Sequence, residues 1–145
     1  MTHKSTDELK NELKTAANLR DYLSKNKENL LTTGLPEYLE RLLSQKGLKK
    51  ADVIRGSLLG RAYVYKIFGG EKKPSRDKLL AIAFGLGLSD QETQEMLKLS
   101  GNRELYPGDE RDAVILFALQ RSQSILEANE LLDDQGLAIL DTSRE

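Results

Sequence analysis

Residues 49–68 read KKADVIRGSLLGRAYVYKIF, and residues 69–75 continue as GGEKKPS. A short helix, a turn that contains glycine and a second helix fit this stretch. Two helices joined in this way form a helix-turn-helix, which can lay its second helix in the major groove of DNA. We therefore expect the rest of the chain to support this unit or to regulate it.

The charge of the chain is distributed unevenly along its length. The formal net charge is −1, yet residues 41–80 carry 11 basic and 3 acidic side chains, and residues 81–145 carry 5 basic and 13 acidic ones. A basic block that coincides with the helix-turn-helix pattern is typical of a DNA-binding face, with a solvated lysine-rich surface as the alternative. The acidic C-terminal part could also lie over the basic face and compete with DNA.

Composition argues against several other classes of protein. The chain has no cysteine and a single histidine, His3. Disulfides, thiolate metal sites and histidine-based catalysis are therefore not expected, and no nucleotide-binding, zinc-protease or nucleophile motif occurs. We predict no enzymatic activity, no cofactor and no metal. No apolar run approaches the ~20 residues that span a bilayer, and no signal peptide is visible, so a soluble cytoplasmic protein is expected.

The whole chain is predicted to be helical, because no stretch alternates with period two. We expect an all-α fold in which five helices over residues 34–101 form the DNA-binding domain. An N-terminal helical arm and linker, residues 1–33, precede it, and a C-terminal helical extension, residues 102–145, follows it. Capping residues and prolines predict the helix starts, and glycines predict the stops. The predicted starts are Ser5, Pro36, Ser75, Ser89, Asp109 and Ser124, and the predicted stops are Gly47, Gly87, Gly101 and Gly136.

Two segments outside the central domain carry further expectations. The segment that Ser5 opens is amphipathic and is predicted to end near Lys25, before a polar linker over residues 26–34. Residues 113–119 are apolar without interruption, which predicts a helix covered on most sides. This run is interpreted as core, with a dimer interface as the alternative.

The second helix of the helix-turn-helix must bury one face and present the other. If Val64 points inward, the 100° step per residue places Ile67 and Phe68 on the same side. The outward side then holds Ala62, Tyr65, Lys66 and Gly69, with Arg61 in the first turn. Arginine and lysine can contact guanine, and tyrosine can contact a phosphate or a thymine methyl group.

Over residues 38–99 the sequence resembles the Xre or Cro/repressor family of helix-turn-helix proteins. The resemblance rests on Gly47-Leu48, Ile67, Gly70, Lys73-Pro74-Ser75, Leu79-Leu80-Ala81-Ile82-Ala83 and Leu86-Gly87-Leu88-Ser89. It implies a five-helix lambda-repressor-like domain and a sequence-specific regulator of transcription.

The resemblance also implies roles for individual residues. Lys50 falls where the family has a phosphate-binding glutamine. Four residues fall on base-contacting positions of the family: Arg61, Ala62, Tyr65 and Lys66. Two lysines, Lys72 and Lys73, fall in the loop that in the family lies along the DNA backbone. Solvated turn lysines are the alternative for the loop. For Tyr65 and its neighbour Tyr63, the alternative is a cover for apolar surface.

The sequence departs from the family at the turn and just before it. Leu58 stands where glycine is usual, and Ile54 stands where a small alanine is usual. Gly56 and Gly60 are then expected to provide the flexibility of the turn. Arg55 is expected to complement the C-terminal end of its helix rather than to contact DNA.

The leading functional hypothesis is a DNA-binding regulator that binds a two-fold site as a homodimer, because one small module binds weakly alone. The flanking helices are the expected dimer interface or partner surface. The alternative is an adaptor or antitoxin-like protein that keeps the fold and binds a protein partner instead of specific DNA.

Overall fold

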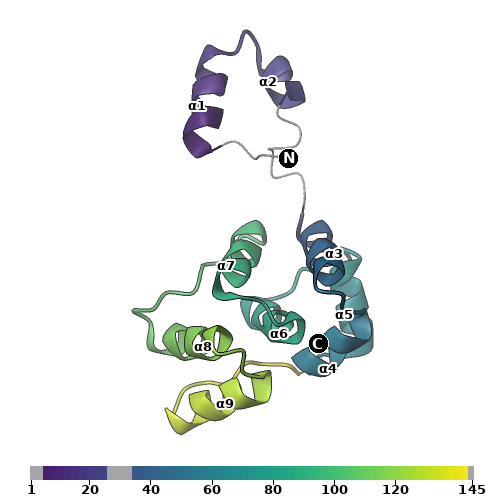
Figure 1. Cartoon of the computed structure of the whole chain (residues 1–145), viewed down its shortest axis with the longest axis vertical. Coiled ribbons are helices and arrows are strands. Elements are labelled where there is room, and N and C mark those ends of the chain that lie inside the picture. Colours follow the sequence, from purple (N-terminus) through teal and green to yellow (C-terminus); the bar gives the residue numbers. More distant parts are fainter. Residues whose placement is uncertain (1–4, 26–33, 144–145) are drawn as a thin grey trace. The chain divides into compact units, whose positions relative to one another are not determined.

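The computed structural model describes residues 5–25 and 34–143. These residues form nine helices and no strand, so the described part of the chain is all-α as predicted (Figure 1). The chain divides into two compact units, residues 1–33 and residues 34–145. Among the described helices, none combines the length and the apolar character that crossing a bilayer requires.

The N-terminal unit contains two helices, α1 (Thr6–Thr15) and α2 (Leu19–Lys25), where the sequence predicted one amphipathic segment. Ser5 begins α1 as predicted, because its hydroxyl accepts the amide of Glu8. The segment breaks because the side chain of Asn18 accepts the amide of Asp21 at 2.8 Å and so starts a second helix. Neither helix has a buried residue. The predicted linker lies almost entirely outside the described residues.

The second unit begins with five helices in the region where the sequence predicted five. They are α3 (Leu35–Gln45), α4 (Lys50–Ser57), α5 (Arg61–Phe68), α6 (Arg76–Leu86) and α7 (Asp90–Leu99). The predicted caps Ser75 and Ser89 accept amides in the first turns of α6 and α7. Pro36 lies in the first turn of α3, where its missing N–H has no helical partner to lose.

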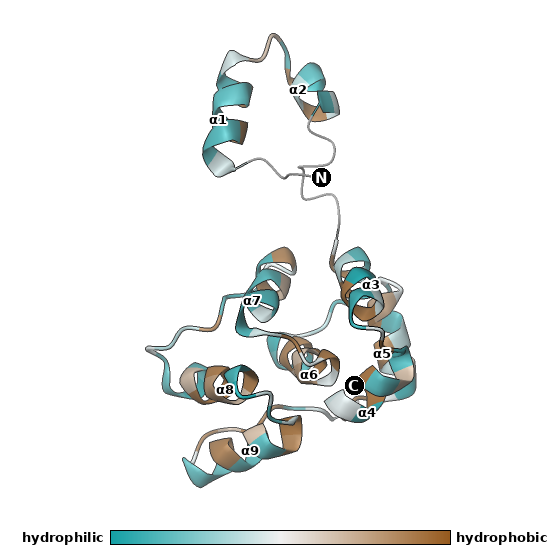
Figure 2. Ribbon diagram, viewed as in Figure 1, coloured by the Kyte–Doolittle hydropathy of each residue, from teal (hydrophilic) through white to brown (hydrophobic). Residues whose placement is uncertain are grey.

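Helix α6 lies at the centre of this unit, and after its charged first turn residues 79–84 are apolar without interruption (Figure 2). Every residue from 78 to 84 is buried, and Leu86 is buried as well. A helix that is covered all round needs neighbours on each face. The helices α4, α7 and α9 pack against it, so α6 joins the N-terminal and C-terminal halves of the unit.

Helices α4 and α6 approach each other closely through two glycines. A Cβ atom added to Gly56 would lie 2.9 Å from the Cα atom of Gly85, and one added to Gly85 would lie 2.8 Å from the carbonyl oxygen of Val53. Side chains at these positions would therefore collide with backbone. Gly56 thus allows close helix packing, and it does not serve the turn.

The turn between α4 and α5 is made by Leu58, which has φ of +64° and ψ of 12°. This left-handed conformation costs a residue with a side chain about 1–2 kcal/mol, which explains why glycine is usual there. The expectation that Gly56 and Gly60 provide the turn's flexibility is wrong, because neither has a positive φ. The buried neighbours Ser57 and Leu59 hold Leu58 in place.

Two further helices, α8 (Glu110–Gln120) and α9 (Ile125–Asp134), complete the second unit. Asp109 and Ser124 cap them as predicted. The apolar run is mainly core, as interpreted, since Ile115, Ala118 and their neighbours Leu116 and Leu119 are buried within the chain. Phe117 remains 42% exposed.

Reciprocal ion pairs connect the first turn of α6 to α8. The guanidinium group of Arg76 donates to both carboxylate oxygens of Asp112, each at 3.0 Å. Arg111 donates in the same manner to Asp77, at 3.0 and 2.9 Å. Both pairs are at least partly buried. Bidentate pairs of this kind set the orientation of α8 on α6.

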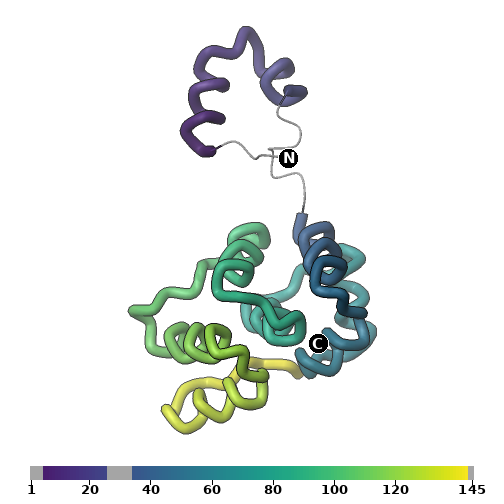
Figure 3. Tube along the Cα trace, in the orientation of Figure 1, coloured from purple at the N-terminus to yellow at the C-terminus, as the bar shows by residue number. Residues whose placement is uncertain are grey.

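The chain continues beyond α9 as residues 137–143, which we name the C-terminal strap. It runs from α9 across the unit towards α4 and α5 (Figure 3). Leu140 is buried at 1% exposure, and its amide donates to the side chain of Asn129. The strap therefore packs on the unit as an extended segment.

Candidate nucleic-acid interface

Helix α5 buries one side and exposes the other in the manner that its periodicity predicts. Val64 and Ile67 are fully buried, and Phe68 is 4% exposed. Its outward side consists of exposed residues: Arg61, Ala62, Tyr65, Lys66 and, at its C-terminal end, Gly69. The inward residues hold α5 on the core, so the outward side chains are not needed for packing.

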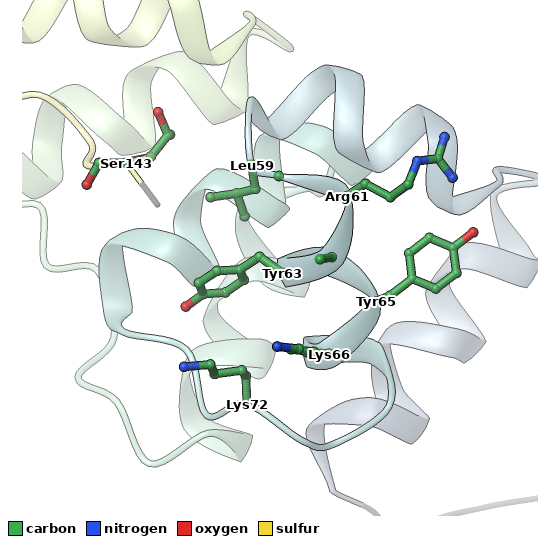
Figure 4. A pocket seen from close by; sticks show the side chains of 10 residues that line it. Leu59, Arg61, Tyr63, Tyr65, Lys66, Lys72 and Ser143 are labelled. Atoms are coloured by element: carbon green, nitrogen blue, oxygen red, sulfur yellow. The ribbon is translucent and has the colours of Figure 1, made fainter. Parts of the chain in front are cut away.

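A cavity of about 650 Å³ lies along α5 (Figure 4). Five of the seven predicted DNA-binding residues line it: Arg61, Ala62, Tyr65, Lys66 and Lys72. The other lining residues are Leu59, Gly60, Tyr63, Thr142 and Ser143. No aspartate or glutamate is among them, so the described lining is cationic and aromatic.

Three of the predicted residues form a cluster in which two cations lie near one aromatic ring. The ammonium group of Lys50 lies 5.4 Å from the ring centre of Tyr65, and the guanidinium group of Arg61 lies 6.0 Å from it. Tyr65 is 47% exposed, so its ring is open to solvent as well. Cation–π contacts of this kind hold charged side chains near the ring without neutralising them.

Among the predicted contacts, Lys50 pairs with an acidic side chain of another helix. Its ammonium group pairs with a carboxylate oxygen of Glu40 on α3 at 3.1 Å. The family resemblance gave Lys50 a phosphate-binding role, and it would have to share its charge with Glu40 in that role. Nothing in the sequence around Lys50 indicates this pair, since Glu40 belongs to another helix.

The two loop lysines lie between α5 and α6 and are both exposed. Lys72 lines the cavity, whereas Lys73 does not. Figure 4 shows Lys72 on the same side of α5 as Tyr63, with Arg61 and Tyr65 on the other side. The predicted residues therefore extend over a broad surface around α5.

Many basic side chains of residues 41–80 pair with carboxylates of the chain itself or are buried. Lys46 pairs with Glu92 at 3.0 Å, and Arg55 pairs with Asp52. Lys50 and Arg76 also have carboxylate partners, and Lys78 is buried at 3% exposure. Within the described residues, Arg61, Lys66 and Lys73 make no ion pair. The cations without a carboxylate thus include two on the outward face of α5.

Sequence reasoning missed part of this surface. Tyr63 is half-buried and packs against the apolar core, as expected of a cover for apolar surface, and it lines the cavity as well. Thr142 and Ser143 line the cavity from a distant part of the sequence. Helical periodicity could have placed Tyr63 beside Lys66, which lies three residues later on α5. No local pattern indicates where the C-terminal strap ends.

Comparisons of the chain with protein-family models, with curated proteins and with solved structures found no match. The function of this surface is therefore inferred from its side chains and their arrangement.

Proposed function

We propose that the chain is a sequence-specific DNA-binding regulator of transcription that lays α5 in the major groove of duplex DNA. The observation that carries the proposal is the division of α5 into two faces. Arg61, Lys66 and the small Ala62 face solvent, and Val64 and Ile67 are fully buried. A helix of this kind is anchored to its domain and offers hydrogen-bond donors outward.

In this proposal α4 and α5 form the helix-turn-helix, and α3 to α7 form the repressor-like domain. Arg61 and Lys66 donate hydrogen bonds to guanine N7 and O6, and Tyr65 contacts a phosphate or a thymine methyl group. Ala62 lets the backbone of α5 approach the bases. Lys50, Lys72 and Lys73 contact phosphates and provide affinity that does not depend on sequence.

The proposed active form is a homodimer in the cytoplasm. A dimer doubles the contacts and binds two half-sites on the same face of the duplex. Apolar side chains on α8 and α9 are candidates for its interface, since Phe117 is 42% exposed and Leu126 is 63% exposed. The same residues are the candidate surface for a protein partner.

Selection of bound duplexes from a random pool tests the proposal. We expect an enriched motif with two half-sites that are separated by about one helical turn, 10–10.5 base pairs, or a multiple of it. Binding should weaken steeply as salt rises, because each phosphate contact releases counterions. A pool without enrichment, together with no salt-dependent binding to random duplex, would refute a DNA-binding role.

A second candidate is an adaptor or antitoxin-like protein that binds a protein partner. It is favoured by ion pairs within the chain that neutralise part of the basic block. Four basic side chains pair with carboxylates: Lys46, Lys50, Arg55 and Arg76. Such a protein would leave duplex DNA unbound at low salt and would still unfold cooperatively. The selection experiment therefore separates the two candidates.

A further inference from the structure

The C-terminal strap reaches the surface that is proposed to bind DNA. Thr142 and Ser143 line the same cavity as Arg61 and Lys66. Figure 4 shows Ser143 on the side of α5 where Tyr63 lies. A segment more than 70 residues away in sequence thus forms one wall of the cavity whose other wall is α5.

The base of the strap is held by several contacts. Arg111, which pairs with Asp77, also donates to the carbonyl oxygens of Ala138 at 2.8 Å and Ile139 at 3.1 Å. Leu140 is buried at 1% exposure, and its amide donates to Asn129 at 2.8 Å. These contacts lie before Thr142, so they hold the strap without involving its tip.

The tip of the strap, residues 142 and 143, is held from α6. The ammonium group of Lys78 donates to the carbonyl oxygen of Ser143 at 2.8 Å and lies 5.2 Å from the ring centre of Tyr63. Thr142 is half-buried and Ser143 is exposed. The tip therefore rests beside α5 and is held from α6 by Lys78.

Space beside a helix in the major groove is limited. An α-helix with its side chains is about 10–12 Å across, and the major groove is about 12 Å wide. A helix inserted in the groove therefore has the two phosphate backbones directly beside it. Ser143 lies beside α5 on the side of Tyr63 and Lys72, where one of these backbones would pass in the proposed complex.

We infer that the tip of the C-terminal strap and duplex DNA compete for the surface beside α5, so that the docked strap is an autoinhibitory contact. This inference rests on the proposed DNA-binding function. The distribution of charge led to the expectation that the acidic C-terminal part covers the basic face. Among the described residues, however, no acidic side chain lines the cavity. Thr142 and Ser143 are uncharged, so these two residues compete by occupying space.

The first test compares two neighbouring alanine substitutions in the full chain. Leu140→Ala removes a buried anchor of the strap, and Ile139→Ala removes a side chain that is 51% exposed. A strap docked in ~90% of molecules lowers the apparent affinity about tenfold, so Leu140→Ala should bind random duplex up to about tenfold more tightly. Ile139→Ala should bind like the wild type.

Salt distinguishes competition for space from an acidic cover. The ratio of affinities between Leu140→Ala and wild type should persist as salt rises, although both affinities fall. A ratio that vanishes at high salt would overturn the inference in favour of electrostatic masking. Equal or weaker binding by Leu140→Ala, with an unchanged helical circular dichroism spectrum, would overturn it as well.

The second test follows the strap directly. The chain has no cysteine, so Ser143→Cys introduces one thiol for a spin label at the tip. Addition of duplex DNA should increase the mobility of this label, and a label at the exposed position 134 (Asp134→Cys) should not respond. DNA binding without a change at position 143 would overturn the strap inference alone. Absence of DNA binding by every variant would instead refute the proposed function on which it rests.

Discussion

Two groups of cationic side chains in the same unit differ in whether carboxylates neutralise them. At the junction of α6 and α8, Arg76 and Arg111 each donate two hydrogen bonds to a carboxylate, and both are mostly buried. Around α5, Arg61, Lys66 and Lys73 are exposed and make no ion pair within the described residues. The first group stabilises the fold, and the second is available to a ligand. The same residue types therefore have different roles because of the carboxylates around them.

The electrostatics of Asp112 illustrate the first group. Burial would raise the pKa of this carboxyl group, but hydrogen bonds from Arg76 and from the amide of Tyr106, with the charges of Arg76 and Arg103, outweigh burial and lower it. The carboxylate is 1% exposed. Its charge is therefore part of the folded structure.

The largest expected effect is that of Asp112→Asn. The amide removes the charge that balances Arg76, and breaking a buried ion pair costs about 3 kcal/mol of unfolding free energy. Glu110→Gln is the matched control, since Glu110 lies in the same turn of α8 and is exposed. Denaturant unfolding checks both variants. Equal stabilities of the two variants would contradict a structural role for the Arg76–Asp112 pair.

The same pair predicts the response to acid. A carboxyl group whose folded pKa is lowered contributes stability above its ordinary pKa of about 3.9, and this stability is lost as the pH falls through the folded value. The wild type should therefore lose stability below about pH 4 more steeply than Asp112→Asn. Thermal unfolding between pH 3 and pH 7 measures the difference. Parallel curves for the two proteins would show that Asp112 does not control the acid response.

The second group should affect binding and leave stability unchanged. Arg61→Ala or Lys66→Ala should cost about 1–3 kcal/mol of binding free energy on the preferred duplex and relax its specificity. Arg55→Ala is the control, because Arg55 pairs with Asp52 and does not line the cavity. Fluorescence anisotropy with matched and scrambled duplexes measures the difference. The assignment of base contacts fails if both variants keep the wild-type preference.

The loop lysines should change affinity without changing specificity. Lys72→Ala or Lys73→Ala should weaken binding to all duplexes similarly and lower the salt dependence by about one unit of log–log slope. Titrations at several salt concentrations measure this slope. A variant that loses specificity and keeps its slope would exclude a phosphate contact.

The smallest expected effect is that of Glu40→Gln, which would free Lys50 from its ion pair. Glu40→Gln removes the carboxylate that pairs with Lys50 at 3.1 Å, so the ammonium group becomes available to a phosphate. Binding to random duplex at low salt should strengthen by ~0.5 kcal/mol, the size of an exposed ion pair. Glu37→Gln on the same helix controls for the change in net charge. Identical binding by both variants would leave Lys50 without a role in DNA binding.

The starts and stops of most helices could be predicted from the sequence because they depend on local contacts. A serine such as Ser89 accepts an amide three residues later wherever the rest of the chain lies. The two faces of α5 also follow from local geometry, since the positions of Val64 and Ile67 on a helix are set by the 100° step. The candidate surface around Arg61 and Lys66 could therefore be predicted, although not its function.

Only the tertiary structure decided which charges remain available and where the strap ends. The net charge of residues 41–80 did not reveal that Lys50 pairs with Glu40 or that Arg76 pairs with Asp112, because the partners lie on other helices. Likewise, Leu58 takes up the left-handed conformation because buried neighbours on both sides hold it there. Thr142 and Ser143 meet α5 through Leu140 and Lys78, contacts between residues far apart in sequence that arise when the chain packs.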